Sequence, residues 1–484
     1  MCGIVGYAGN IETACGKPLE VCLQGLERLE YRGYDSAGVA LTAPGMDKVV
    51  VRKKAGRLKN LVEDIERKPM PLATVGIGHT RWATNGEPSD VNAHPHTSMD
   101  GKVAIIHNGI IENASQLRLD LQAEGYRFAS ATDTEVAAKL LGKIVDKIIA
   151  DEGKPDLFKA VRRMARMLEG AFTILATDCR QPDIVVGARH DSPLVVGLGE
   201  GENFLGSDVA AFVAYTKRAM EVDQDQAVCV SADKVIVTDF DGNVVENPKT
   251  YTVDWDASAA EKGGWDSFMD KEIHEDPAAV QRTLLGRFDA NGGITLDEVR
   301  IDEHDFKAID KIIVVACGTA SYAGQVAKYA IEHWVRIPVE IELAHEFRYR
   351  DPILTPRTLV VAISQSGETM DTLMALRHAR EQGSKVLAIC NTQGASIPRE
   401  SDAVLYTHAG PEVAVASTKA FVAQITAAYL LGLYLAQVKG AMFRDEIHQV
   451  LDSLKDMPRK IQWVLDTQPK TIQAAAERMV NANS

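Results

Sequence analysis

The first candidate catalytic residue is Cys2, which Gly3 follows directly in "MCGIVGYAGN". An initiator methionine is commonly removed before a small residue, and removal of Met1 would leave Cys2 with both a thiol and a free α-amino group. The reference pKa is about 8.5 for the thiol and roughly 7.7–8.0 for the amine, so a neutral amine can serve as the base for its own thiol. Cys2 is therefore a candidate nucleophile. The alternative is a small residue that starts a buried strand.

Two further stretches, "HTRWATNG" and "HNGIIEN", carry side chains suited to binding an amino acid. Arg81 can pair bidentately with a substrate carboxylate. Asn108 and the N–H of Gly109 can form an oxyanion hole, and Asp133 can bind an ammonium group. A ligand with both a carboxylate and an ammonium is an amino acid. The alternatives are a surface arginine and turn residues in hairpins.

The second half of the chain has three hydroxyl-rich stretches, "CGTAS", "SQSGET" and "VASTKA". In a doubly wound sheet such loops lie at the carboxyl ends of the strands, where helix N-termini offer free N–H groups to an anion. No GxxxxGK[ST] motif is present, so a small phosphorylated ligand is favoured over a nucleoside triphosphate. The alternative is that these Ser and Thr residues only cap helices.

The pattern of apolar residues places these stretches in two kinds of domain. Residues 1–240 contain short apolar runs, predicted as strands, with helices over residues 17–33 and 132–150. Thr132 or Asp133 is the expected N-cap of the second helix. This mixture predicts an α+β domain with large antiparallel sheets.

Regular alternation of strands and helices begins near residue 311. The strands are uniformly apolar, which predicts a parallel sheet covered on both faces. Residues 241–290 are more polar and predict a helical connector, and residues 445–484 predict helices only.

Composition and charge exclude several classes of function. The chain has 484 residues, 46% hydrophobic and 25% charged, with a net charge of −14 and no basic block, which argues against nucleic-acid or anionic-membrane partners. Its seven cysteines are scattered without a CxxC pair, which favours a reducing, cytoplasmic compartment and predicts neither a disulfide framework nor a zinc site. No signal peptide is expected before Cys2. The uncharged run 420–438 predicts a buried helix rather than a membrane span.

Several motifs together resemble a known family. "MCGIVGY", "LEYRGYDSAG", "HTRWAT", "HNGIIEN" and "ATDTEV" resemble the N-terminal-nucleophile glutaminase domain of glutamine amidotransferases. "CGTASYAG", "SQSGET" and "AGPEVAVASTKAF" resemble a sugar isomerase (SIS) domain. Their order is similar to that in the glutamine–fructose-6-phosphate aminotransferase family. The resemblance implies an αββα glutaminase domain over 2–240, a helical connector over 241–292, a doubly wound SIS domain over 293–442 and a helical segment over 443–484.

The resemblance also implies a role for individual residues. Cys2 is the expected nucleophile, Asn108 and Gly109 form the oxyanion hole, and Trp82 gates the passage of ammonia. The residues implied to bind glutamine are Arg32, Arg81, Thr84 and Asp133. Those implied to bind fructose 6-phosphate are Thr319, Ser364, Gln365, Ser366, Thr369 and Ser417. No cofactor and no metal are expected, and the chain is expected to form a homodimer.

Two departures from the family pattern accompany this resemblance. Asn85 stands where the family usually has His, and the sequence ends at Ser484, where a second SIS domain would begin. We therefore expect glutamine hydrolysis and sugar-phosphate binding without formation of glucosamine 6-phosphate. We also expect the apolar helix 420–438 to seek a partner surface. The alternatives are another glutamine amidotransferase, although "SGGxDS" is absent, or a non-catalytic sugar-phosphate-binding protein.

Overall fold

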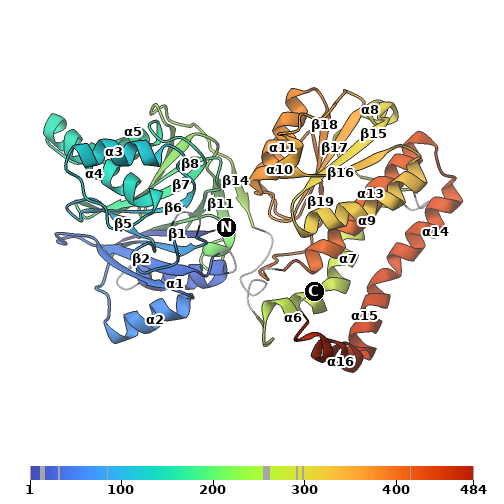
Figure 1. Ribbon diagram of the computed structural model, residues 1–484, viewed down its shortest axis with the longest axis horizontal. Helices are drawn as coiled ribbons and strands as arrows, with labels where there is room; N and C mark the ends of the chain where they lie inside the picture. The colour runs from blue at the N-terminus through green and yellow to red at the C-terminus, as the bar shows by residue number, and fades with distance from the viewer. Residues whose placement is uncertain are drawn as a thin grey trace. The chain divides into compact units, whose positions relative to one another are not determined.

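The computed structural model describes residues 2–10, 17–30, 33–83, 86–253, 262–289, 293–296, 299–414 and 416–482. The chain forms two compact units, unit 1 over Met1–Ala260 and unit 2 over Glu261–Ser484, and Figure 1 labels their helices and strands.

Unit 1 is built on two antiparallel sheets. The larger contains, in spatial order, β14 (Thr250–Thr252), β11 (Arg218–Glu221), β9 (Val195–Leu198), β10 (Glu202–Gly206), β1 (Gly3–Gly9), β4 (Val75–Arg81), β2 (Ser36–Thr42) and β3 (Val50–Ala55). The smaller contains β13 (Val235–Asp239), β12 (Gln226–Val230), β8 (Gln181–His190), β7 (Phe172–Asp178), β6 (Val103–Gly109) and β5 (His96–Thr97). Antiparallel pairing throughout confirms the expectation from the short apolar runs.

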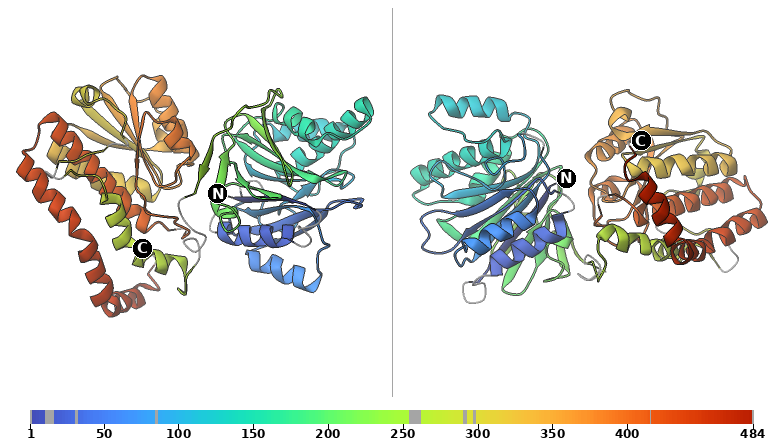
Figure 2. Two further views of the ribbon diagram at one scale, coloured as in Figure 1. Left: turned by 180° about the vertical axis from the view of Figure 1, so that it is seen from behind. Right: turned by 60° about the horizontal axis from the view of Figure 1, so that its bottom comes forward.

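Helices cover the outer faces of the two sheets, as Figures 1 and 2 show. Those on the larger sheet are α1 (Lys17–Leu29) and α2 (Leu58–Arg67), with a 3₁₀ turn at Val209–Ala211. Those on the smaller sheet are α3 (Ala114–Ala123), α4 (Asp133–Glu152) and α5 (Leu157–Ala165). Because strand side chains alternate between faces, Ile4 of β1 packs between the sheets while Val5 packs under α1. The layers confirm the predicted αββα fold.

Both helices predicted for unit 1 are present, and the structure defines where each of them ends or begins. The helix expected over 17–33 ends at Leu29. The second helix, α4, has Thr132 as its N-cap, because the Thr132 Oγ1 accepts a hydrogen bond from the N–H of Glu135 at 3.3 Å. Asp133 is thereby the first residue of the helix, and its carboxylate is available for other contacts.

The segment predicted as a connector from residue 241 divides between the two units. Its first part contributes β14, which pairs with β11 in the larger sheet of unit 1. Its second part forms α6 (Phe268–His274) and α7 (Asp276–Leu284), which belong to unit 2. There Ala279 of α7 packs with Ala409 and Ala423.

Unit 2 is a doubly wound α/β unit, as predicted. Its sheet is wholly parallel and contains β16 (Val339–Leu343), β15 (Lys311–Ala316), β17 (Thr358–Ser364), β18 (Lys385–Cys390) and β19 (Ala403–Tyr406). One face is covered by α8 (Glu303–Ala308), α9 (Thr319–Val335) and α13 (Lys419–Lys439), the other by α10 (Ala344–Phe347), α11 (Met370–Glu381) and α12 (Ser396–Glu400). The tail is helical, with α14 (Arg444–Lys455), α15 (Met457–Thr467) and α16 (Pro469–Met479).

Among the described residues, one helix is long and apolar enough to span a membrane. It is α13, with a mean hydropathy of 1.5, and 61% of its most apolar window is buried inside the protein. The helix packs against α9 and α7, and Leu430, Leu431 and Leu433 are fully buried. The prediction of a buried core helix is confirmed. The expectation that this helix seeks a further partner surface is wrong, because α7, α8 and α9 already cover it.

Truncation of a buried leucine in α13 tests this role in the core. Leu431→Ala should lower the free energy of unfolding by about 2–5 kcal/mol, since it removes buried methyl groups and leaves a cavity. Leu285→Ala is the matched control, because Leu285 is 76% exposed. Urea denaturation measures both variants, and equal midpoints would contradict a core position for α13.

Candidate active site

Cys2 lies at the junction of two neighbouring strands of unit 1. Gly3 pairs with Thr80, which brings Cys2 beside the end of β4. The N–H of Trp82 donates a hydrogen bond to the Cys2 Sγ at 3.2 Å, and the thiol lies 3.5 Å from the Trp82 carbonyl oxygen. Burial raises the pKa of the Cys2 thiol, and the Trp82 hydrogen bond and the positive charge of Arg81 oppose this effect. The thiol is therefore protonated at neutral pH and needs a base before it can attack.

Asn108 reaches the same point from the other sheet. It lies near the end of β6, and its Nδ2 donates a hydrogen bond to the carbonyl oxygen of Cys2 at 3.0 Å. Its neighbour Gly109 has a φ of +123°, and a Cβ there would lie 2.0 Å from the carbonyl oxygen of Ala171. Only glycine fits this position, so the backbone turn that follows Asn108 depends on Gly109.

A buried histidine fixes the orientation of the Asn108 amide. The His79 Nε2 lies 3.0 Å from the Asn108 Oδ1 and 2.9 Å from the carbonyl oxygen of His107. Both neighbours are acceptors, so the proton of His79 must be on Nε2. Burial lowers the pKa of His79 to about 3, which keeps the ring neutral. Because the Asn108 Oδ1 faces His79, its NH₂ group faces Cys2. The sequence analysis assigned no role to His79, although this residue begins the "HTRWAT" motif.

Arg81 and Asp133 lie close enough to Cys2 for both charges to affect its pKa. The Arg81 guanidinium is buried and donates a hydrogen bond to the Gly86 carbonyl oxygen at 2.9 Å. The Asp133 carboxylate accepts from the N–H of Ile111 at 2.9 Å, which ties the start of α4 to the segment after Gly109. The structure thus brings together the predicted nucleophile, the oxyanion pair and the two charged residues.

The remaining predicted residues of unit 1 have different outcomes. Trp82 is 41% exposed and makes an edge contact with the Tyr34 ring at 5.4 Å. Arg32 and Thr84, predicted to bind glutamine, lie outside the described residues, as does Asn85.

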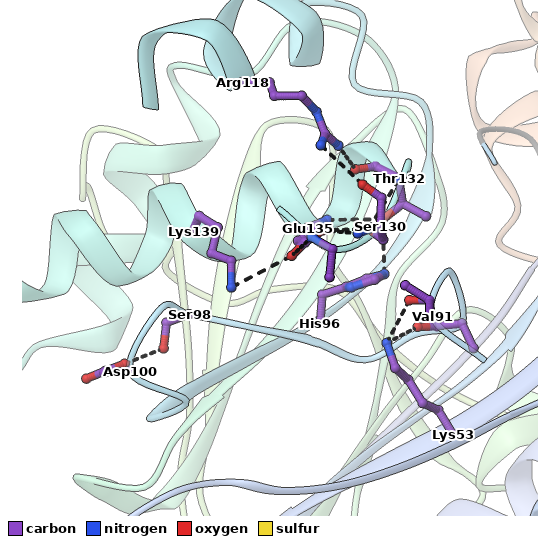
Figure 3. Close-up of polar contacts among 12 residues, drawn as sticks. Lys53, Val91, His96, Ser98, Asp100, Arg118, Ser130, Thr132, Glu135 and Lys139 are labelled. Carbon is purple, nitrogen blue, oxygen red and sulfur yellow. Dashed lines mark hydrogen bonds and ion pairs between the residues drawn. The ribbon is translucent and has the colours of Figure 1, made fainter. Parts of the chain in front are cut away.

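A hydrogen-bond network supports the N-terminus of α4, as Figure 3 shows. Glu135 accepts from the N–H and Oγ of Ser130 at 2.6 and 2.8 Å. Arg118 donates to the carbonyl oxygens of Ser130 and Thr132, and the His96 Nε2 lies 3.0 Å from the Thr132 Oγ1. These bonds hold the residues immediately before α4 in one arrangement. These bonds therefore fix the position of the Asp133 carboxylate, at the first residue of α4, independently of the surface loops.

In unit 2, predicted hydroxyl residues gather between β17 and α11. The Ser364 Oγ lies 3.2 Å from the Thr369 Oγ1 and accepts from the N–H of Gly367 at 3.0 Å. The Ser366 Oγ accepts from the N–H of Glu368 at 3.2 Å. Helix α11 begins at Met370, with Thr369 as its N-cap. We call residues 364–369 the hydroxyl loop, and it lies at the positive end of a helix.

The other predicted residues of unit 2 lie near the same edge of the sheet. Thr319 begins α9 directly after β15, and Gln365 is part of the hydroxyl loop. The Ser417 Oγ donates to the Glu412 Oε2 at 3.0 Å in the segment between β19 and α13. Because parallel strands end at one edge, the segments that follow β15, β17 and β19 start from that edge.

Two buried carboxylates hold the segment that carries Ser417, and the sequence analysis named neither of them. Glu272 of α6 accepts from the N–H of Val413 at 2.6 Å and from the N–H of Ala414 at 3.1 Å. Glu412 accepts from the N–H groups of Thr418 and Ala420 at 2.9 and 3.0 Å. The "AGPEVAVASTKAF" motif contains Glu412, but no sequence signal links residue 272 to this segment.

Burial raises the pKa of Glu272 to about 7 from its ordinary value of 4.5. The folded state therefore binds a proton more tightly than the unfolded chain, and its stability falls as the pH rises from 4.5 to 7. Glu272→Gln retains an acceptor for the Val413 N–H and removes this titration. Relative to the wild type, the variant should gain stability as the pH rises through that window.

Thermal unfolding at several pH values on both sides of 7 measures this difference. Glu303→Gln, a change at an exposed residue of α8, is the control and should follow the wild type at every pH. If Glu272→Gln also followed the wild type at every pH, the raised pKa would be wrong.

Comparison with known proteins finds a domain of a known family in each of the two units. A glutamine amidotransferase domain model matches residues 79–214, and a SIS domain model matches residues 306–434. Two relatives named glutamine–fructose-6-phosphate aminotransferase [isomerizing], from Corynebacterium diphtheriae and Corynebacterium efficiens, are 60% and 61% identical to this chain. Each alignment covers all of this chain and 77% of the relative.

Among solved structures, the C-terminal domain of glucosamine-fructose-6-phosphate aminotransferase from Francisella tularensis is 37% identical. The match covers 46% of this chain and 61% of that one, with a TM-score of 0.44. On the identity and coverage of its relatives, this chain belongs to the glutamine–fructose-6-phosphate aminotransferase (isomerizing) family.

Proposed function

We propose that this protein releases ammonia from L-glutamine at Cys2 and uses it to convert fructose 6-phosphate into glucosamine 6-phosphate, with glutamate as the second product. The proposal replaces the expectation from the sequence that no glucosamine 6-phosphate forms, because relatives that match the whole chain carry the name of the complete reaction. The observation that carries the glutaminase half is the contact between Cys2 and the Asn108 amide, whose orientation His79 fixes. The names of the relatives favour fructose 6-phosphate over the acceptors of other glutamine amidotransferases and over a non-catalytic binding role.

The glutaminase step begins with loss of a proton from the Cys2 thiol. Once Met1 is removed, the α-amine of Cys2 accepts this proton, and the thiolate attacks the side-chain amide carbon of glutamine. The negative charge that develops on the amide oxygen is stabilised by the Asn108 Nδ2 and the N–H of Gly109. The protonated amine then gives its proton to the leaving nitrogen, and ammonia departs. Water hydrolyses the remaining thioester to glutamate and regenerates the thiol.

Arg81 and Asp133 define which amino acid enters this site. Arg81 binds the α-carboxylate of glutamine and Asp133 binds its α-ammonium, with Arg32 and Thr84 as further contacts. A fixed pair of opposite charges holds the side-chain amide at a set distance from Cys2. Trp82, half-exposed beside the thiol, is placed to act as the gate for ammonia.

The hydroxyl loop supplies the phosphate site of the sugar half. Ser364, Ser366 and Thr369 donate to the phosphate at the N-terminus of α11, where the helix end favours negative charge. Gln365, Thr319 and Ser417 contact the sugar. A hydrogen bond to a charged group contributes about 1.5–3 kcal/mol, so several such bonds distinguish fructose 6-phosphate from fructose.

We further propose a homodimer in the cytoplasm whose glutaminase and sugar reactions need no cofactor. Helix α9 exposes Tyr322, Val326 and Tyr329 along one side, and it packs beside β16, an edge strand. An apolar row of this kind supports self-association. Every cysteine in the described part of the chain is free, which supports a reducing compartment.

Two variants test the proposed reaction in separate assays. Cys2→Ala should abolish glutamate release because the nucleophile is lost, whereas Cys22→Ala should retain it. Ser366→Ala should weaken binding of fructose 6-phosphate by about tenfold, the effect of losing one charged hydrogen bond. It should leave glutamate release intact. Glutamate assays and calorimetry measure the two effects. Near-normal glutamate release by Cys2→Ala, or equal affinity of the wild type for fructose and fructose 6-phosphate, would contradict the proposal.

A third variant tests the role of His79 as a positioning residue. His79→Ala removes the donor that holds the Asn108 Oδ1, so the amide loses its fixed orientation. The kcat for glutamate release should fall by about 10²–10³, the range for loss of one oxyanion donor. The KM for glutamine should change less, because Arg81 and Asp133 are intact. His79→Gln retains an N–H donor and should recover part of the kcat.

The effect must also depend on Asn108. In an Asn108→Ala background, His79→Ala should cost little more, because residues that act through one interaction are not additive. His304→Ala, at an exposed position of α8, is the control. Additive losses would show that His79 acts only through stability.

A further inference from the structure

Three side chains capable of binding a metal ion meet in unit 2. One ligand atom from each of Cys317, His345 and Asp371 lies within 4.8 Å of the other two. Cys317 directly follows β15, His345 lies in α10 after β16, and Asp371 lies in the first turn of α11 after β17. Three separate segments therefore converge at the carboxyl edge of the parallel sheet.

We propose that Cys317, His345 and Asp371 bind a zinc ion. A thiolate, an imidazole and a carboxylate form a donor set that suits zinc, and three protein ligands leave the fourth tetrahedral position open to water. Zinc–ligand bonds of about 2.0–2.3 Å place neighbouring ligand atoms roughly 3.3–3.6 Å apart. In this structure the three ligand atoms lie within 4.8 Å of one another, so they must move closer together by about 1 Å to bind the ion. His345 and Asp371 are exposed, so rotation of their side chains closes the remaining gap without a change in the backbone.

The contacts around these side chains leave their ligand atoms available. The Cys317 Sγ accepts a weak hydrogen bond from the Thr372 Oγ1 at 3.9 Å and further hydrogen bonds from the backbone N–H groups of Ala344 and His345. Within the described part of the chain, the Asp371 carboxylate has neither a hydrogen bond nor an ion pair. The His345 Nε2 lies 3.9 Å from a carboxylate oxygen of Glu346.

The sequence analysis predicted no zinc site because the chain has no CxxC pair. The absence of a CxxC pair argues only against structural zinc sites in which two cysteines of one turn bind the ion. Here each ligand comes singly from its own segment, so no spacing in the sequence indicates the site. Cys317 and Asp371 are each two residues from a residue proposed to bind the sugar, Thr319 and Thr369. A bound ion would therefore join the segment after β15 and α10 to the first turn of α11, which directly follows the hydroxyl loop.

Cobalt and zinc titrations of the full chain, first freed of metal by a chelator, test the proposal. One equivalent of Co²⁺ should produce a thiolate-to-cobalt charge-transfer band and the intense visible bands of a tetrahedral site, and Zn²⁺ should displace it. Cys317→Ser should abolish the charge-transfer band. His345→Ala and Asp371→Asn should each weaken zinc binding by at least about tenfold, measured by competition with a chromophoric chelator.

Two matched variants distinguish this site from other thiols and imidazoles. Cys2→Ala should keep the full cobalt band, which excludes the proposed nucleophile as the ligand. His333→Ala, at an exposed position of α9, should bind zinc as tightly as the wild type. No charge-transfer band in the wild type, a band that survives Cys317→Ser, or a band lost in Cys2→Ala would overturn the proposal. The readout needs no enzymatic turnover, so it stands apart from the outcome of the glutaminase assays.

Discussion

The hydrogen bond between His79 and Asn108 is the constraint on which the glutaminase site depends. His79 belongs to β4 of the larger sheet and Asn108 to β6 of the smaller one, so the bond joins the two sheets beside Cys2. Both partners are buried, and a buried polar group without a partner costs about 1–3 kcal/mol. That cost keeps the asparagine oxygen towards the imidazole and the NH₂ group towards the carbonyl oxygen of Cys2. Neither sheet alone could set this arrangement.

Elsewhere in the unit 1 site, other buried neutral groups also fix the ends of strands and helices. His94, His96 and His107 are also buried beside this bond, and burial lowers the pKa of each ring. These rings stay neutral near pH 7, which avoids the cost of a buried charge. Two of them contact the start of α4, because the His96 Nε2 lies 3.0 Å from the Thr132 Oγ1 and the His107 Nδ1 lies 3.0 Å from the Thr134 Oγ1. The ends of β4, β6 and α4 are thereby held by directional bonds among neutral groups.

The sequence predicted the parts of this structure that depend on neighbours along the chain. Apolar runs located the strands, and the residue before Asp133 capped its helix as expected, because both effects act within a few residues. The roles of His79 and Glu272 escaped prediction because their partners lie 29 and 141 residues away. Helix α11 begins only at Met370, since Gly367 takes a left-handed conformation and Thr369 an extended one. The apolar run 420–438 could not reveal which elements cover it.

The two units hold the segments that carry their predicted site residues with different buried groups. These groups differ in pKa. Unit 1 uses imidazoles whose pKa values burial has lowered, so these rings do not titrate near pH 7. Unit 2 uses the carboxylate of Glu272, whose pKa of about 7 lies within the physiological range. Loss of its proton strengthens the bonds that it accepts from Val413 and Ala414 but places a charge in a buried site next to Glu412. Titration of Glu272 therefore makes the segment that carries Ser417 sensitive to pH near neutrality.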